Sequence, residues 1–110
     1  MAEQERGLAG EARRLADLIA YQDGSVVSRQ VMKSEGGNVT LFAFDRGEGL
    51  TEHTSPFDAL VYVLDGEAEV TVSGVASTLR EGDMILMPAN APHALKAPSR
   101  FKMLLVMVKG

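Results

Sequence analysis

The chain has no cysteine and no tryptophan, and only two of its 110 residues are histidine. The lack of cysteine excludes disulfides, thiolate metal sites and cysteine nucleophiles. No apolar run approaches 18 residues, so we expect no membrane span and no membrane partner. The polar start over residues 1–6 does not resemble a signal peptide, and we therefore expect a cytoplasmic protein.

The charge balance is mildly acidic, with a formal net charge of −4. This charge balance gives no indication of a basic surface patch, and we therefore expect no nucleic-acid partner. With 45% hydrophobic and 24% charged residues, the composition is that of an ordinary globular protein. At this length we predict one domain, consisting of a helical extension over residues 1–22 and a single barrel over residues 23–110.

A short amphipathic helix is predicted over residues 8–20. Its apolar positions recur at intervals of three and four, and they are Leu8, Ala12, Leu15, Leu18 and Ile19. The stripe is small and lacks Trp or Phe, which disfavours a helix lying on a membrane surface. We expect this helix to pack across a barrel end or a subunit surface.

The remaining chain reads as short strands separated by turn residues. The predicted strands are 25–33, 38–45, 59–64, 67–73, 75–79, 83–87, 93–96 and 101–108, with a turn at Asp65–Gly66 between the third and the fourth. Turn signals about every 8–12 residues are typical of an all-β sandwich or barrel.

Two of these strands are apolar on both faces. In residues 60–64 and 103–108, apolar side chains occupy both the odd and the even positions. The strand at 67–73, in contrast, has one apolar and one polar face. An antiparallel strand buries both faces only when another element covers the outside. The cover is the N-terminal helix, a second subunit, or both, and we expect a homodimer. The edge strand at 25–32 is a candidate for exchange with the partner or pairing to it.

The two histidines, His53 and His93, are 40 residues apart and each follows a turn-rich segment. Imidazole is the commonest metal ligand in proteins and titrates near neutral pH. Period-two alternation places Ser55 on the same strand face as His53, and it directs Ala59, Val61 and Val63 to the interior. Methionines in such a chain are expected to fill the core rather than to bind a soft metal; they include Met84, Met87, Met103 and Met107.

The histidine blocks share the spacing of a known pair of motifs. The first block contains Gly47, His53 and Gly66, and the second contains Gly82, Pro88 and His93. Over roughly residues 47 to 97 these blocks resemble the two motifs of the cupin superfamily. The resemblance implies an all-β double-stranded β-helix (jelly-roll) barrel, here preceded by the short N-terminal helix.

The chain departs from the family pattern at the ligand positions. In metal-binding cupins three histidines and a glutamate hold iron, manganese, nickel or zinc, but here Ser55 takes one histidine position and Ala59 takes the glutamate position. A serine hydroxyl is a poor ligand for these metals. Asn90 replaces a motif glycine and Ala97 a motif asparagine. Asparagine tolerates positive φ, so we expect the loop before His93 to keep its shape.

Three interpretations of the histidine pair remain open. In the first, the imidazoles hydrogen-bond each other, Ser55 or water inside a closed barrel. In the second, His53 and His93 hold a weakly bound divalent ion (Zn, Ni, Mn or Fe). Water, substrate or a carboxylate then completes its shell, and Asp58 could reach back to it while Glu52 faces away. In the third, the pair binds a small organic molecule without a metal.

Two functions follow from these interpretations. The first is a small-molecule binding or sensing protein whose pocket is anchored by His53, Ser55 and His93. The second is an enzyme with His53 and His93 as candidate catalytic residues. It would be a metal-assisted oxygenase or isomerase, or a metal-free isomerase or cyclase with a histidine as acid or base. The missing ligands argue against a standard metal-dependent dioxygenase, and the fold does not choose between the two functions.

Overall fold

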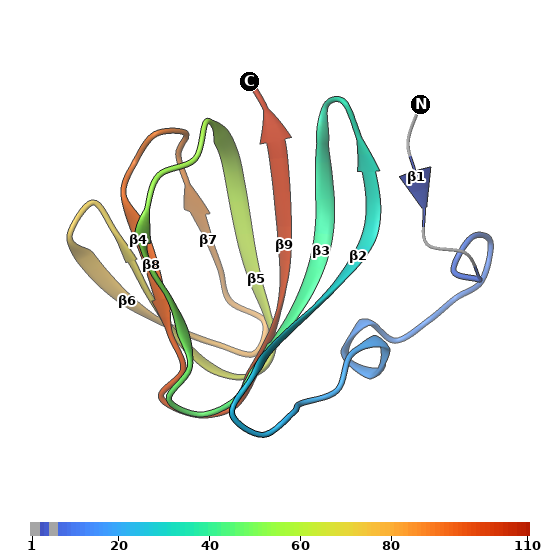
Figure 1. Ribbon diagram of the computed structural model, residues 1–110, viewed down its shortest axis with the longest axis horizontal. Helices are drawn as coiled ribbons and strands as arrows, with labels where there is room; N and C mark the ends of the chain where they lie inside the picture. The colour runs from blue at the N-terminus through green and yellow to red at the C-terminus, as the bar shows by residue number, and fades with distance from the viewer. Residues whose placement is uncertain (1–2, 5–6) are drawn as a thin grey trace.

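The computed structural model describes residues 3–4 and 7–110, and strands dominate it. Figure 1 shows these strands curled into a half-barrel, with the N-terminal segment (residues 7–22) lying outside β2. This confirms the predicted all-β barrel. The elements in chain order are β1 (Glu3–Gln4), η1 (a 3-10 turn, Leu15–Leu18), β2 (Val26–Ser34), β3 (Gly37–Phe44), β4 (Gly49–His53), β5 (Phe57–Val72), β6 (Val75–Arg80), β7 (Met84–Met87), β8 (His93–Lys96) and β9 (Phe101–Lys109).

Strand β5 is the centre of the fold and pairs with four other strands. The strand order is β1-β2-β3-β9-β5-β8-β4, and β6 and β7 also pair with β5. The first half of β5 lies against β7 and β9, and the second half lies against β6 and β8. All these pairings are antiparallel, so β5 passes from one wall of the barrel to the other.

The predicted break at Asp65–Gly66 is wrong, because β5 continues through it as one bent strand. The register against β9 shifts between Val63 and Asp65, which marks a β-bulge. A bulge inserts one residue and bends the strand while the ladder continues. Gly66 has φ +74°, and a Cβ there would meet the carbonyl oxygen of Arg100. Asp65–Gly66 therefore forms a bend within one strand and does not reverse the chain.

The alternating apolar side chains of β5 point into the core. Ala59, Val61 and Val63 are buried, as predicted, and so are Ala68 and Val70 beyond the bulge. The odd spacing between Val63 and Ala68 requires the extra residue of the bulge if both are to face inward. Elsewhere in the core, the rings of Phe44 and Phe101 stack at a centroid distance of 4.4 Å.

The predicted helix over residues 8–20 is wrong in extent, since only the single 3-10 turn Leu15–Leu18 forms. Gly7 and Gly10 have φ of +90° and +75°, outside the helical region. Arg14, which precedes the turn, is extended and makes no side-chain cap. The apolar periodicity instead reflects packing onto the sheet. No helix in the described part of the chain is long and apolar enough to cross a membrane.

Hydrogen bonds hold the N-terminal segment against the outside of the sheet. Tyr21 donates to Asp65 Oδ2 at 2.5 Å, and the Lys102 ammonium donates to the Ala16 carbonyl at 2.6 Å. Burial and the Asp65 carboxylate raise the pKa of the Tyr21 phenol. Beneath the segment lies an apolar cluster of Leu15, Leu18, Ile19 and Tyr21 with Val27, Val31, Leu41, Ala43, Leu64 and Leu104. The segment thus supplies part of the expected outer cover.

The strand predicted at residues 25–32 pairs within its own chain. β2 runs antiparallel to β3 from Val26 to Ser34, with a bulge between Gln30 and Met32. Its other edge meets β1 at Lys33 and Met32. The pairing therefore needs no strand from a second subunit, and a homodimer stays a prediction that other surfaces have to support.

Candidate functional site

The two histidines meet where β4 lies against β8. His53 and His93 are direct partners in the antiparallel register, and a bulge separates this pair from the pairing of Leu50 with Leu95. Because the bulge shifts the alternation by one residue, Leu50 and His53 line the same cavity although they are three positions apart. The histidines therefore converge because β4 pairs with β8 in this register.

The two imidazoles contact each other through their Nε2 atoms, which are 3.1 Å apart. The rings meet edge to face, with centroids 4.3 Å apart and an interplanar angle of 72°. His53 is exposed, whereas His93 is 6% exposed. The pair consequently runs from the surface into the interior, with His53 at the mouth.

Both Nδ1 atoms face backbone carbonyl oxygens. His53 Nδ1 lies 2.7 Å from the Thr51 oxygen, and His93 Nδ1 lies 3.1 Å from the Ala91 oxygen. A carbonyl only accepts, so each Nδ1 carries the hydrogen, and a neutral imidazole has no second one. Both Nε2 atoms are then acceptors directed at each other. The pair is one hydrogen short, and an added proton or an external donor satisfies it.

Ser55 lies beside the pair and connects the two histidine-bearing loops. Its Oγ accepts from the backbone N–H of Phe57 at 3.2 Å, and its carbonyl accepts from the backbone N–H of Asn90 at 2.7 Å. Asn90 has φ +67°, which confirms that the loop keeps a conformation usually taken by glycine. The structure thus gathers all three predicted site residues, His53, Ser55 and His93, around one cavity.

The cavity beneath the pair has a volume of about 180 Å³ and is mostly apolar. Met87, Met103 and Met107 line it, in agreement with the expected core-filling role, but Met84 is 46% exposed on the outer face. Strict alternation along β7 explains the difference, since Met84 and Met87 lie on opposite faces. The other lining residues are Phe42, Leu50, Ala59, Leu95 and Leu105.

Sequence reasoning missed four of these lining residues. Phe42, Leu95 and Leu105 follow from period-two alternation within β3, β8 and β9, once Phe44, His93 and Met103 are known to face inward. Leu50 does not, because its inward direction depends on the β4 bulge. Strand alternation could therefore predict most of the lining residues, but not the position that depends on the bulge.

The residues present do not fit a resident metal with three protein ligands. Two imidazole nitrogens about 2.1 Å from one ion lie roughly 3.0–3.4 Å apart, so the 3.1 Å spacing suits two ligands. Yet among the residues that the structure describes, no group of three or more His, Cys, Asp or Glu side chains converges. Asp58, expected in a turn that reaches back, belongs to β5 and accepts instead from the Ala89 N–H at 2.9 Å.

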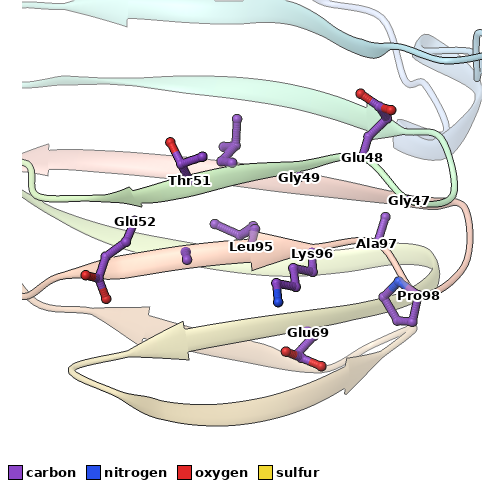
Figure 2. A pocket seen from close by; sticks show the side chains of 12 residues that line it. Gly47, Glu48, Gly49, Thr51, Glu52, Glu69, Leu95, Lys96, Ala97 and Pro98 are labelled. Carbon is purple, nitrogen blue, oxygen red and sulfur yellow. The ribbon is translucent and has the colours of Figure 1, made fainter.

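A second, wider depression follows the outer side of β4, β8 and β5. Its volume is about 560 Å³, and Figure 2 shows Glu48, Glu52, Glu69 and Lys96 around it. Glu52 and Lys96 are exposed and lie on strand faces opposite the cavity. Neither histidine lines this groove, so the histidine pair and an enclosed cavity come together at the smaller site.

Comparison with known proteins gives consistent matches. A model of the cupin domain matches residues 40–109. A crystal structure of a conserved protein of unknown function from Streptococcus pyogenes has a TM-score of 0.88 and 36% identity, covering 92% of this chain and 89% of that one. A cupin superfamily protein from Desulfitobacterium hafniense has a TM-score of 0.87 and 31% identity, covering 92% and 93%. An uncharacterised Aquifex aeolicus protein is 27% identical over 99 residues, 88% of this chain and 82% of the relative.

Proposed function

The chain belongs to the cupin family, and we propose that it binds a small, largely apolar molecule in the cavity beneath His53 and His93. The observation that carries the proposal is the contact of the two Nε2 atoms at the polar end of an otherwise apolar cavity. Pockets with apolar walls and a few convergent polar groups are typical ligand sites. Family membership alone does not assign this function.

The size of the cavity limits the ligand. An apolar cavity of about 150 Å³ is large enough for benzene, so the 180 Å³ here accommodates a single ring or a short branched chain. The side chains of Phe42, Met103 and Leu105 provide apolar contact around it. A larger molecule would have to extend past His53 into solvent.

The polar end of the cavity favours a ligand with one hydrogen-bond donor. Both Nε2 atoms act as acceptors because the Nδ1 hydrogens are held by carbonyl groups. A hydroxyl group of the ligand supplies the hydrogen that the pair lacks. A simple apolar molecule would leave the buried His93 acceptor unsatisfied, which costs about 1–3 kcal/mol, whereas exposed His53 is in reach of water.

An isomerase or cyclase that uses proton transfer is the second candidate, and the same contact favours it. Exposed His53 is in reach of solvent, whereas His93 is buried and lines the cavity. Protons can pass along the Nε2–Nε2 contact, so that one imidazole takes a proton from a bound substrate while the pair exchanges with water. This mechanism needs no metal.

Phenol and toluene form a matched pair of probes for the binding proposal, since they differ by the donor hydroxyl. We expect phenol to bind more tightly than toluene to protein purified without a histidine tag, as measured by NMR titration. Ala59→Leu fills the cavity and should abolish the binding of both probes. His93→Asn should weaken phenol by about tenfold and leave toluene nearly unchanged.

Lys96→Ala is the control for the outer groove and should leave both affinities unchanged. If neither probe binds, or if Ala59→Leu binds them as wild type does, the proposal fails. Organic extraction and mass spectrometry of the purified protein distinguish the two candidates. A co-purified molecule recovered unchanged after incubation supports binding alone, whereas conversion that disappears in His93→Asn supports the enzyme.

A further inference from the structure

Most of strand β2 carries its apolar side chains on the outside and its polar side chains on the inside, the reverse of β5. Val27 and Val31 point outward into the apolar cluster beneath the N-terminal segment. Ser28 is the register partner of Phe42, which lines the cavity, and partners in an antiparallel pair share one face of the sheet. Gln30, two positions further along, lies on that inner face as well. Both polar side chains are exposed, so they face the concave side of the half-barrel.

The inner face of β3 changes from apolar to polar toward the hairpin that joins it to β2. Phe44 is buried and Phe42 lines the cavity. Thr40 and Asn38 occupy the next two inward positions, and both are half-buried. On the neighbouring strand β9, Met107 is the register partner of Asn38 and lines the cavity. The apolar cavity therefore borders directly on Asn38.

The side-chain amide of Asn38 is held in one orientation, and its nitrogen faces a weak acceptor. Thr40 Oγ1 donates to Asn38 Oδ1 at 3.2 Å, which directs the amide nitrogen to the other side. There Nδ2 lies 3.9 Å from the Met107 sulfur. An amide nitrogen carries two donor hydrogens, whereas a thioether is only a weak acceptor. At this point of the cavity wall, a stronger acceptor would fit where the sulfur lies.

Asn38 and the histidine pair belong to opposite walls of the cavity. Strands β3 and β9 form one wall and β4 and β8 form the other, as the curl of the half-barrel in Figure 1 shows. Facing layers of β-structure lie about 10 Å apart, a distance that one ring with a polar group at each end bridges. Lys33, the exposed register partner of Asn38 on the same inner face, places positive charge beside the amide.

We propose that Asn38 is a second polar anchor of the cavity and that the ligand is a hydroxy acid built on a single ring. Its hydroxyl group contacts the histidine pair, and its carboxylate accepts from the Asn38 amide. This inference rests on the proposed function, because the ring and the hydroxyl group are those of the ligand described there.

The carboxylate takes the place of the Met107 sulfur, and the flexible methionine side chain turns aside. Hydrogen bonds to an ionised acceptor are roughly twice as strong as neutral ones, and Lys33 adds attraction. An amine at the same end of the ligand would meet amide donors and a lysine, so the site disfavours it.

Phenol and 4-hydroxybenzoate form a matched pair of probes, since they differ by the carboxylate. We expect NMR titration of the wild type to show about tenfold tighter binding of 4-hydroxybenzoate. Asn38→Leu removes the amide and keeps a side chain of similar size. It should cancel the advantage of 4-hydroxybenzoate and leave the affinity for phenol unchanged, which also shows that the cavity is intact in the variant.

Asn38→Asp tests the position by reversing its preference, because a carboxylate there repels an acid and attracts an amine. This variant should bind 4-hydroxybenzylamine more tightly than 4-hydroxybenzoate, the opposite of the wild type. Lys33→Gln should weaken 4-hydroxybenzoate by about threefold at low salt. Lys96→Gln is the matched control, since Lys96 is exposed on the outer groove, and it should leave the affinity unchanged.

The outcomes distinguish failure of this inference from failure of the proposed function. If phenol does not bind to the wild type, the binding function fails and the role of Asn38 with it. If phenol binds but 4-hydroxybenzoate binds no more tightly, or if Asn38→Leu keeps the advantage of 4-hydroxybenzoate over phenol, only the role of Asn38 is overturned. An Asn38→Asp variant that still prefers 4-hydroxybenzoate to 4-hydroxybenzylamine overturns it as well.

Discussion

The backbone N–H of Asn90 donates a 2.7 Å hydrogen bond to the carbonyl oxygen of Ser55. This bond joins the loop that precedes His93 to the loop that follows His53, although the two residues are 35 positions apart. It forms because Asn90 adopts φ +67°, a conformation that non-glycine residues seldom take. The loops on either side of the histidine pair are thus joined through the backbone of Asn90.

Two substitutions of Asn90 should distinguish the effect of the positive φ on stability from the effect of losing the side chain. Asn90→Gly should change the free energy of unfolding by less than about 0.5 kcal/mol, since glycine adopts this φ freely. Asn90→Val should reduce it by about 1–2 kcal/mol, because a β-branched side chain is strained there. Urea denaturation followed by circular dichroism measures both. Equal stability of the valine and glycine variants would contradict this account.

Gly66→Ala should be strongly destabilising. A Cβ at this position would lie 1.8 Å from the Arg100 carbonyl oxygen, and the φ of +74° is unfavourable for alanine. Because the obstacle is backbone within the β5–β9 pairing, we expect a loss of at least about 3 kcal/mol in urea denaturation. Gly74→Ala is the control, with φ +81° and no atom within 4 Å of its Cβ, and it should lose about 1 kcal/mol. Similar losses at both positions would refute the close approach.

Tyr21→Phe should remove the hydrogen bond to Asp65 and reduce the free energy of unfolding by about 1 kcal/mol at neutral pH. Burial and Asp65 raise the pKa of Tyr21, so the neutral phenol stabilises the folded state below the ordinary pKa of about 10. That contribution is lost as pH rises further, because the unfolded chain ionises first. The difference between wild type and Tyr21→Phe should therefore shrink above pH 10.

Tyr62→Phe is the control for this experiment, since Tyr62 lies on the outer face and is 36% exposed. It should match the wild type at neutral pH in the same urea titration. A Tyr21→Phe variant as stable as the wild type would show that the bond to Asp65 contributes nothing.

Metal content should stay far below one ion per chain. Two imidazoles supply fewer ligands than the three usual at a catalytic metal site. We expect protein purified without a tag and dialysed against Zn²⁺ or Ni²⁺ to retain the same small amount as His53→Ala and His93→Ala, measured by elemental analysis. Retention of about one equivalent by the wild type, lost in either variant, would establish a metal site and redirect the functional proposal.

Much of the site could be predicted from the sequence because strand alternation is a local property. It directed Ala59, Val61 and Val63 to the interior, where the structure places them. The prediction that His53 and Ser55 share a strand face is wrong, because β4 ends at His53, although Ser55 lines the same cavity from the loop that follows. The inward direction of Leu50 was not predictable, since the β4 bulge arises from pairing with a strand more than 40 residues away.

The sequence by itself determined most of the strands, their apolar faces and the two histidine positions, because alternation and turn residues act over a few neighbours. It did not predict β4 (Gly49–His53), the strand that carries His53. Tertiary structure decided the rest. It reduced the N-terminal helix to a single turn, since packing on Leu41 and Leu104 outweighs the weak helical preference of a short segment. It also carried β5 through Gly66 as a bend, because pairing with β9 continues on both sides of the bulge. Finally, it brought both Nε2 atoms within 3.1 Å, because the pairing of β4 with β8 makes His53 and His93 register partners although they are 40 positions apart.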